Sequence, residues 1–222
     1  MDPALAGSAE LRARFANELA VGRSFEHPSL LPFHDGGEER GVPWVSMRWV
    51  DGSDLRHLAP LAPRRAARIV AAVAGALNAM HELGLVHRDV KPGNVLVEGT
   101  GGGVFLTDFG LAKAISSDPG LTVGGNWLGT ADFAAPEQIR GLAVDARTDV
   151  YALGGVLFWA LTGRVPYPED SDEAKMRAHL SEPPPSLDGP LGAVVARAMA
   201  KDPGERFASA GELGRAALAA AG

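Results

Sequence analysis

Cysteine is absent from this sequence of 222 residues. Disulfide bonds, catalysis by a thiolate and zinc sites built on cysteine ligands are therefore all excluded. The six histidines are scattered along the chain and are not spaced as a metal site. The chemistry of this chain must accordingly rest on other residue types.

The chain also lacks an excess of positive charge and any long apolar run. With 21 basic and 27 acidic residues its net charge is −6, which would repel a phosphate backbone, so neither nucleic acid nor an anionic membrane is expected as a partner. The two most apolar stretches, residues 69–80 and 150–161, are shorter than the ~20 residues that a membrane helix needs. The start of the chain has no cationic segment typical of a signal peptide. We therefore expect a soluble, cytoplasmic protein with no membrane segment in this chain.

The chain does contain enough apolar sequence for a globular core, since 46% of its residues are hydrophobic and 22% are charged. No internal repeat or low-complexity linker divides it, so we expect one continuous unit. Helical spacing of apolar residues predicts a first helix between Ser8 and Gly22. Two short strands are expected at residues 30–34 and 44–50, separated by a turn-rich stretch that runs from Asp35-Gly36-Gly37 to Gly41.

The rest of the chain is predicted to be mainly helical. The expected elements are helices over residues 63–82, 150–161, 170–180, 191–199 and from Ser209 onward, together with a small hairpin of strands at 95–97 and 104–107. The segment 150–161 is apolar on all sides, which indicates a helix at the centre of a helical domain. Capping boxes are indicated at Asp170 with Glu173 and at Ser209 with Glu212.

The most informative segment is His87-Arg88-Asp89-Val90-Lys91-Pro92-Gly93-Asn94, followed by Asp108-Phe109-Gly110. Asn94 would lie at the entrance of the predicted hairpin and Asp108 just past its exit, so the two side chains can lie side by side. Their oxygens suit Mg²⁺, which completes its shell with phosphate oxygens and water. Asp89 would be close enough to orient a hydroxyl, with Lys91 placed to neutralise phosphate charge. Metal-assisted phosphoryl transfer is the reaction class that these residues favour.

These two segments resemble the catalytic and magnesium loops of eukaryotic-like (Hanks-type) bacterial Ser/Thr protein kinases. Three further motifs follow in the order of that family: Ala135-Pro136-Glu137 resembles the end of the activation segment, residues 148–154 the central buried helix, and residues 202–207 the entry to the final helix. The resemblance extends from about Ser8 to the C-terminus. It implies an α+β protein-kinase-like fold, with a truncated small lobe of one helix and short antiparallel strands at residues 1–50 and a mainly helical large lobe at 51–222.

The resemblance implies a catalytic role for four residues. Asp89 would accept or orient the substrate hydroxyl, and Lys91 would contact the γ-phosphate. Asn94 and Asp108 would hold Mg²⁺. The implied function is transfer of the ATP γ-phosphate to serine or threonine hydroxyls of a protein substrate, with ATP and Mg²⁺ as cofactors.

Further residues are implied for the nucleotide and for regulation. Met47 resembles the gatekeeper, the residues up to Val50 resemble the hinge beside the adenine, and Leu96 would form the floor of that pocket. Glu18 resembles the glutamate of the small-lobe helix. Thr122 is the expected autophosphorylation site, ahead of Ser116 and Ser117. A solvated loop residue is the alternative for Thr122.

Other motif residues are expected to be structural rather than catalytic. Asp149 should accept hydrogen bonds from the backbone of the catalytic loop, and Glu137 should form a buried ion pair with Arg206. His87 is expected to pack under the active site, and not to act as a base or a ligand.

One part of the family pattern is not found in this sequence. The partner of Glu18 would be a strand lysine, but the four lysines are Lys91, Lys113, Lys175 and Lys201. The glycine-rich loop and the first strands of the small lobe are missing as well, since only seven residues precede Ser8. Two explanations stand: the start of a working kinase lies upstream, or the chain is a catalytically impaired pseudokinase that acts as a binding or scaffold module. A small-molecule phosphotransferase of kinase-like fold is disfavoured, because residues 129–137 resemble the substrate-docking segment of protein kinases.

Overall fold

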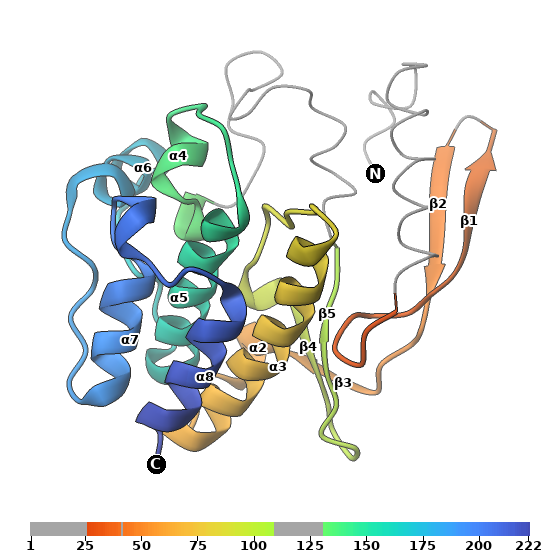
Figure 1. Cartoon of the computed structure of the whole chain (residues 1–222). Helices are drawn as coiled ribbons and strands as arrows, with labels where there is room; N and C mark the ends of the chain where they lie inside the picture. Colours follow the sequence, from red (N-terminus) through yellow and green to blue (C-terminus); the bar gives the residue numbers. More distant parts are fainter. Residues whose placement is uncertain (1–25, 41, 109–130) are drawn as a thin grey trace.

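The computed structural model describes residues 26–40, 42–108 and 131–222. Helices occupy one side of the molecule, and two small antiparallel sheets occupy the other (Figure 1). The elements are, in chain order, β1 (Phe33–Glu39), β2 (Val42–Met47), β3 (Gly52–Asp54), α2 (Leu55–Leu58), α3 (Pro63–Glu82), η2 (Pro92–Asn94), β4 (Val95–Glu98), β5 (Val104–Leu106), η3 (Ala131–Phe133), α4 (Pro136–Ile139), α5 (Ala146–Thr162), α6 (Asp172–Ser181), α7 (Pro190–Ala198), η4 (Pro203–Glu205) and α8 (Ala210–Ala220). This arrangement confirms the expected α+β architecture with a mainly helical large part.

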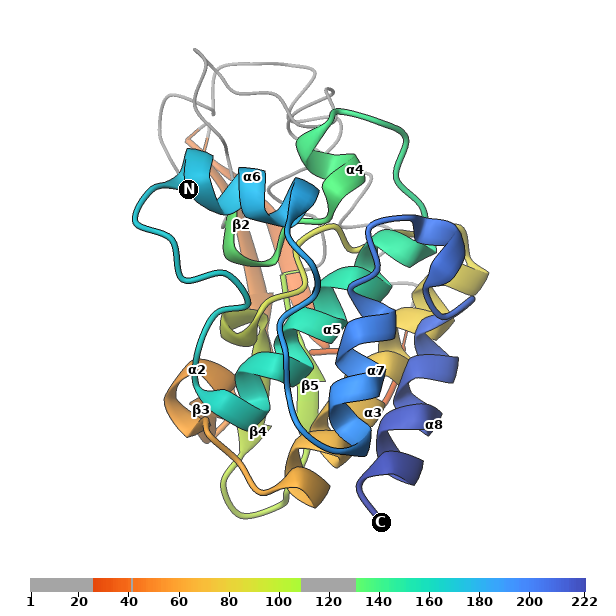
Figure 2. The same cartoon turned by 90° about the vertical axis from the view of Figure 1, so that its left-hand side faces the viewer.

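The core lies between α3, α5, α7 and α8, which run side by side in Figure 2. Helix α5 is buried on nearly all sides, as its apolar sequence predicts, and it begins where the Asp145 side chain accepts the N–H of Arg147. It ends at Gly163, which adopts the left-handed conformation with φ 69°. Gly154 lets α7 approach closely, because a Cβ at that position would lie 2.6 Å from the Cβ of Ala198. Helix α5 is therefore the central support of the large lobe.

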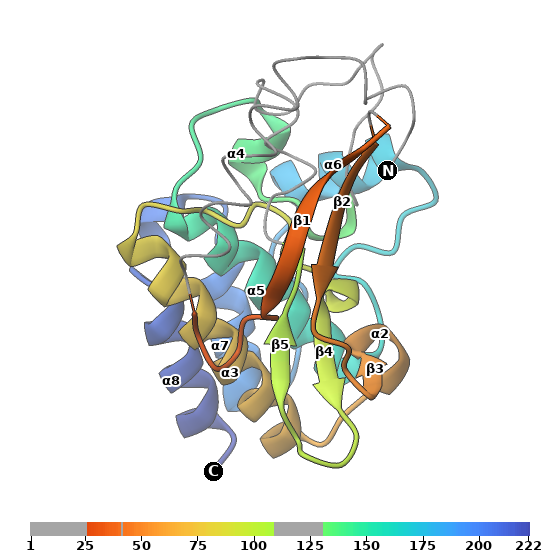
Figure 3. The same ribbon diagram turned by 90° about the vertical axis from the view of Figure 1, so that its right-hand side faces the viewer.

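The sheets are joined through the segment that precedes β1. Strand β4 pairs with β3 on one side and with β5 on the other, and β1 pairs only with β2. The N–H of Leu31 donates to the carbonyl of Leu106, and the N–H of Leu106 donates to that of Ser29. Figure 3 shows the β1–β2 pair extending beyond the β4–β5 hairpin.

The expected helices over 63–82 and 150–161 and the expected hairpin are all confirmed, with small shifts at their ends. The capping box predicted at Asp170 with Glu173 is wrong, because the cap is the next residue and Ala174 takes the place of Glu173. Helix α6 begins after Ser171, whose hydroxyl accepts the N–H of Ala174 at 3.2 Å. Ser209 is confirmed as the cap of α8, since its hydroxyl accepts the N–H of Glu212 at 3.2 Å.

The turn-rich stretch predicted from Asp35 to Gly41 begins too early, because Asp35-Gly36-Gly37 lie within β1 and the two strands are joined only after Glu39. Gly36 is paired with Val45 and Gly37 with Trp44 across the sheet. The ring of Trp44 lies over Gly37, at the ordinary contact distance of 3.5 Å from where a Cβ would be. Cross-strand packing thus outweighs the local turn preference of the glycines. The predicted helix between Ser8 and Gly22 lies outside the described residues.

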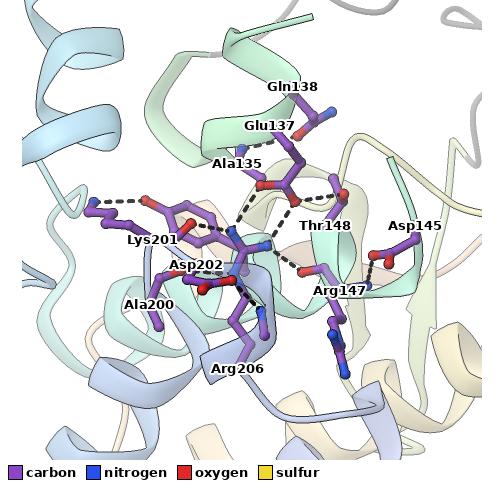
Figure 4. A network of polar contacts seen from close by, with 12 residues as sticks. Ala135, Glu137, Gln138, Asp145, Arg147, Thr148, Ala200, Lys201, Asp202 and Arg206 are labelled. Atoms are coloured by element: carbon purple, nitrogen blue, oxygen red, sulfur yellow. Dashed lines mark hydrogen bonds and ion pairs between the residues drawn. The ribbon is translucent and has the colours of Figure 1, made fainter. Parts of the chain in front are cut away.

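A buried ion pair ties the end of the activation-segment motif to the C-terminal part of the chain (Figure 4). The guanidinium of Arg206 donates to both carboxylate oxygens of Glu137, at 2.8 and 2.9 Å, and Thr148 donates its hydroxyl to the same carboxylate. Burial would raise the pKa of Glu137, but the hydrogen bonds and charge of Arg206 outweigh it and hold that pKa below its ordinary value. The expected Glu137–Arg206 pair is confirmed.

No helix within the described part of the chain is both long enough and apolar enough to cross a lipid bilayer.

We expect Arg206→Ala to lower the free energy of unfolding by about 3–5 kcal/mol, because it leaves the buried Glu137 carboxylate without its charge partner. Arg56→Ala is the matched control, since Arg56 forms an exposed ion pair with Asp54 that contributes less than about 1 kcal/mol. Urea denaturation of both variants measures the difference. Equal losses would show that the Glu137 pair is no more important than a surface contact.

Candidate active site

The loop of residues 87–91 is held from below by one buried carboxylate. Asp149, in the first turn of α5, accepts the backbone N–H groups of His87 and Arg88, both at 2.8 Å. Its Oδ2 atom also lies 2.7 Å from Nε2 of His81, near the end of α3. Because Asp149 is fully buried, these contacts replace the water that would otherwise surround its carboxylate. The expected role of Asp149 is confirmed.

Two non-glycine residues of the site adopt positive φ angles, Arg88 at 65° and Asp108 at 57°. Such conformations are uncommon for residues with a side chain and persist where surrounding contacts hold them. Arg88 is held on both sides, because its N–H donates to Asp149 and its carbonyl accepts Nε2 of Gln138 at 2.9 Å. The backbone at the candidate site is thus shaped by its neighbours rather than by local preference.

His87 is fully buried beneath the loop. Its Nδ1 atom accepts the N–H of Asp89 at 3.3 Å, so Nε2 carries the proton and donates it to the carbonyl of Thr107 at 3.1 Å. Burial lowers the pKa of His87, which keeps the ring neutral. These contacts support the structural role expected for this histidine.

The three predicted residues of the loop lie together. Lys91 Nζ is 2.8 Å from Oδ2 of Asp89. Asn94 donates its amide nitrogen to the backbone carbonyl of Asp89 at 2.8 Å and to Oδ2 of the same residue at 3.1 Å. The Asp89 carboxylate is therefore oriented by an ammonium group and an amide, and it is partly exposed to solvent.

Asn94 and Asp108 are brought to the same end of the β4–β5 hairpin. The N–H of Thr107, the residue before Asp108, donates to the backbone carbonyl of Asn94 at 2.9 Å. Because the amide nitrogen of Asn94 is directed to Asp89, its oxygen Oδ1 is the atom left to bind a cation. Asp108 is exposed and adds carboxylate oxygens. Oxygen donors of these two kinds fit Mg²⁺.

Of the residues expected around the adenine, Met47 lies next to this end of the hairpin, whereas the residue after Val50, Asp51, contacts Gly99 at the turn of the hairpin. Sδ of Met47 accepts the hydroxyl of Thr107 at 3.8 Å, which places the expected gatekeeper beside the residue before Asp108. Leu96 is partly buried in β4, paired with Asp54 on one side and Phe105 on the other. Val50 is half-buried between β2 and β3. Glu18, Thr122, Ser116 and Ser117 lie outside the described residues.

Motif reasoning missed Gln138. Its side chain accepts the N–H of Ala135 at 3.1 Å and donates to the carbonyl of Arg88, so it links the start of α4 to the catalytic loop. Together with Phe133, Ala134, Asp89 and Lys91 it lines a narrow recess of about 10 Å³. A glutamine after Ala135-Pro136-Glu137 carries no distinctive sequence signal, because its partner lies 50 residues away.

Known proteins resemble this chain in sequence and in fold. Residues 6–211 match the family of the protein kinase domain. Serine/threonine-protein kinase PknD of Mycobacterium tuberculosis (strain ATCC 25618 / H37Rv) is 43% identical over 98% of this chain and 34% of its own length. Serine/threonine-protein kinase PknJ of Mycobacterium bovis (strain ATCC BAA-935 / AF2122/97) is 41% identical over 95% of this chain and 38% of its own. The chain thus spans about a third of the length of these curated relatives.

A solved structure of similar fold is the kinase domain of Mycobacterium tuberculosis PknI. It superposes with a TM-score of 0.76 at 34% sequence identity, covering 100% of this chain and 83% of that one.

We expect Asp149→Ala to lower the melting temperature strongly, since each buried donor left without a partner costs about 1–3 kcal/mol. Asp89→Asn should change it little, because this carboxylate is partly exposed and its pair with Lys91 contributes less than about 1 kcal/mol. Thermal unfolding of the two variants by circular dichroism is the measurement. A loss for Asp89→Asn as large as that for Asp149→Ala would contradict the division into a supporting and a solvent-facing carboxylate.

Proposed function

The chain belongs to the protein kinase family, and on that premise we propose that it transfers the γ-phosphate of ATP to serine or threonine hydroxyls of protein substrates. The observation that carries the proposal is the single network of Asp89, Lys91 and Asn94 at the hairpin end next to Asp108. The curated relatives described above are named serine/threonine-protein kinases, which supports this acceptor class.

Asp89 is the residue proposed to act on the acceptor. Its carboxylate is oriented by Asn94 and partly exposed, and the residue lines the recess, so the carboxylate can accept a hydrogen bond from an incoming hydroxyl and then its proton. Lys91 lines the same recess, and its ammonium group can neutralise charge on the transferred phosphoryl group.

The nucleotide and metal are proposed on the chemistry of the residues present. Asn94 Oδ1 and the Asp108 carboxylate would hold Mg²⁺, with Met47, Val50 and Leu96 beside the adenine and Glu18 in the small-lobe helix. When bound, Mg²⁺ neutralises charge on the phosphates of ATP. The side-chain nitrogen of Asn94 remains on Asp89, so the same residue can orient the proposed base and bind the cation.

A non-catalytic binding module is the second candidate. One observation favours it, namely that no lysine precedes Lys91 in the sequence, whereas the family pattern pairs a strand lysine with the residue that Glu18 resembles. The retained Asp89, Lys91, Asn94 and Asp108 favour the kinase, because a module without catalysis has no chemical need of them together.

We expect this chain to bind ATP weakly and only with Mg²⁺, because the proposed metal residues are present whereas the glycine-rich loop is not in the sequence. Isothermal titration calorimetry with ATP in Mg²⁺ and in EDTA measures this. Asp108→Ala should abolish the ATP binding that is seen in Mg²⁺. Asp188→Ala, at an exposed aspartate before α7, is the control and should leave it unchanged. Equal affinity in Mg²⁺ and EDTA would contradict the metal assignment.

The proposed function is tested by transfer of ³²P from [γ-³²P]ATP to a generic protein substrate. Two forms are assayed: first the chain with the present sequence, and second the same chain with the first three small-lobe strands of the PknI kinase domain added before it. We expect transfer to serine and threonine in the second case, reduced by about 10²–10⁴-fold in Asp89→Asn. Mass spectrometry of the protein itself should find phosphate on Thr122. Folded protein that binds Mg²⁺ and ATP but transfers no phosphate would overturn the kinase and favour the binding module.

A further inference from the structure

A second group of polar side chains lies inside the helical lobe, away from the catalytic loop. It consists of Tyr151 on α5, Tyr167 in the segment after α5, His179 on α6 and Lys201 in the segment after α7. The hydroxyl of Tyr151 lies 2.8 Å from Nδ1 of His179, and Nζ of Lys201 lies 3.3 Å from the hydroxyl of Tyr151 and 2.8 Å from that of Tyr167. Tyr151 and His179 are both fully buried, so these contacts replace water for both.

The direction of each hydrogen bond follows from the chemistry of its ends. Nε2 of His179 lies 3.0 Å from the backbone carbonyl of Asp132, and a carbonyl only accepts, so Nε2 carries a proton. Burial lowers the pKa of His179 to about 4, so at neutral pH the ring is uncharged and Nδ1 has no proton. The hydroxyl of Tyr151 must then donate to Nδ1.

The two outer members complete the chain of bonds. The ammonium group of Lys201 can only donate, and it donates to the oxygens of Tyr151 and Tyr167. The hydroxyl of Tyr167 donates a hydrogen bond to the carbonyl of Pro183 at 3.0 Å. One series of hydrogen bonds therefore runs in a single direction from Lys201 through Tyr151 and His179 to the Asp132 carbonyl. Such series strengthen each member by polarisation.

The series ends on the turn that faces the catalytic loop. Asp132 is the middle residue of η3, and the next two residues, Phe133 and Ala134, line the recess with Asp89 and Lys91. Helix α6 holds this turn at two points, because His179 binds the main chain of Asp132 and Lys175 forms an ion pair with its carboxylate at 2.8 Å. Figure 2 shows α6 crossing the end of the bundle close to α4.

We propose that His179 is a positioning residue for the protein substrate: oriented by Tyr151 and Lys201, it fixes the carbonyl of Asp132 and so the wall of the recess opposite Asp89. The proposal rests on the kinase function proposed above. It concerns the acceptor side of the site, because the two residues that follow Asp132 line the recess together with Asp89 and Lys91.

Two conservative variants separate this role from simple filling of the core. Tyr151→Phe keeps the buried ring but removes the hydroxyl that donates to His179. Tyr167→Phe is the matched control, because its hydroxyl contacts Tyr151, Lys201 and the carbonyls of Glu182 and Pro183 but is not bonded to His179, and because the ring that packs on His179 is kept. Both variants lose one buried hydroxyl, so a purely structural role would make them behave alike.

The first arm of the experiment needs no activity. Long-range ¹H–¹⁵N spectra should show His179 with its proton on Nε2 in the unmutated chain and in Tyr167→Phe, and a changed Nδ1 signal in Tyr151→Phe. Amide exchange at Ala134, whose N–H donates to the carbonyl of Ala131, should be about three- to tenfold faster in Tyr151→Phe only, as the weakening of one hydrogen bond implies. A proton on Nδ1 in the unmutated chain, or equal exchange in both variants, would overturn the proposal.

The second arm measures steady-state kinetics in the form that carries the three added strands. Tyr151→Phe should raise KM for the protein substrate about three- to tenfold while leaving KM for ATP and kcat near their unmutated values, and Tyr167→Phe should change none of them. Transfer with an unchanged protein-substrate KM in Tyr151→Phe would overturn the positioning role alone. No transfer by the unmutated form would overturn the kinase function itself, and the substrate role of His179 with it.

Discussion

A single buried carboxylate supports the catalytic loop of this protein. Asp149 has no contact with water, and its charge is compensated by two backbone N–H groups of the loop and by His81. A buried charge without such partners would be very unfavourable, so the loop has to present its N–H groups to α5 in this one arrangement. The positive φ of Arg88 and the placement of Asp89 are consequences of that requirement.

The same central helix supports the acceptor side of the site through polar contacts of a different kind. Glu137 and Arg206 fasten the start of α4 to η4, and Tyr151 orients His179, which holds the η3 turn. Both sides of the recess therefore depend on α5: the loop that contains Asp89 is held by the carboxylate of Asp149, and the η3 turn is held through the hydroxyl of Tyr151. This arrangement explains why a helix whose side chains do not enter the proposed chemistry is among the most completely buried parts of the molecule.

The residues proposed for catalysis could be predicted as a group because they are close in the sequence. Asp89, Lys91 and Asn94 are within six residues of one another, and the short β4–β5 hairpin returns the chain to Asp108. The backbone shape of the loop depends in addition on Asp149, which is distant in the sequence. The long helices were predictable for a similar reason, since their periodic apolar positions face one core. The expectation at Asp35-Gly36-Gly37 was wrong because local turn preference competes there with cross-strand pairing to Trp44, which lies in another segment.

The sequence by itself therefore determined the order of motifs, the main helices and the set of groups available for phosphoryl transfer, all of which depend on neighbours within one turn or one hairpin. Only the tertiary structure decided the roles of Gln138 and His179. A buried glutamine or histidine becomes a positioning group through the atoms packed against it, and these come from residues 50, 28 and 47 positions away, namely Arg88, Tyr151 and Asp132. Which side chain donates and which accepts depends on both partners, and the sequence does not show which residues will be partners.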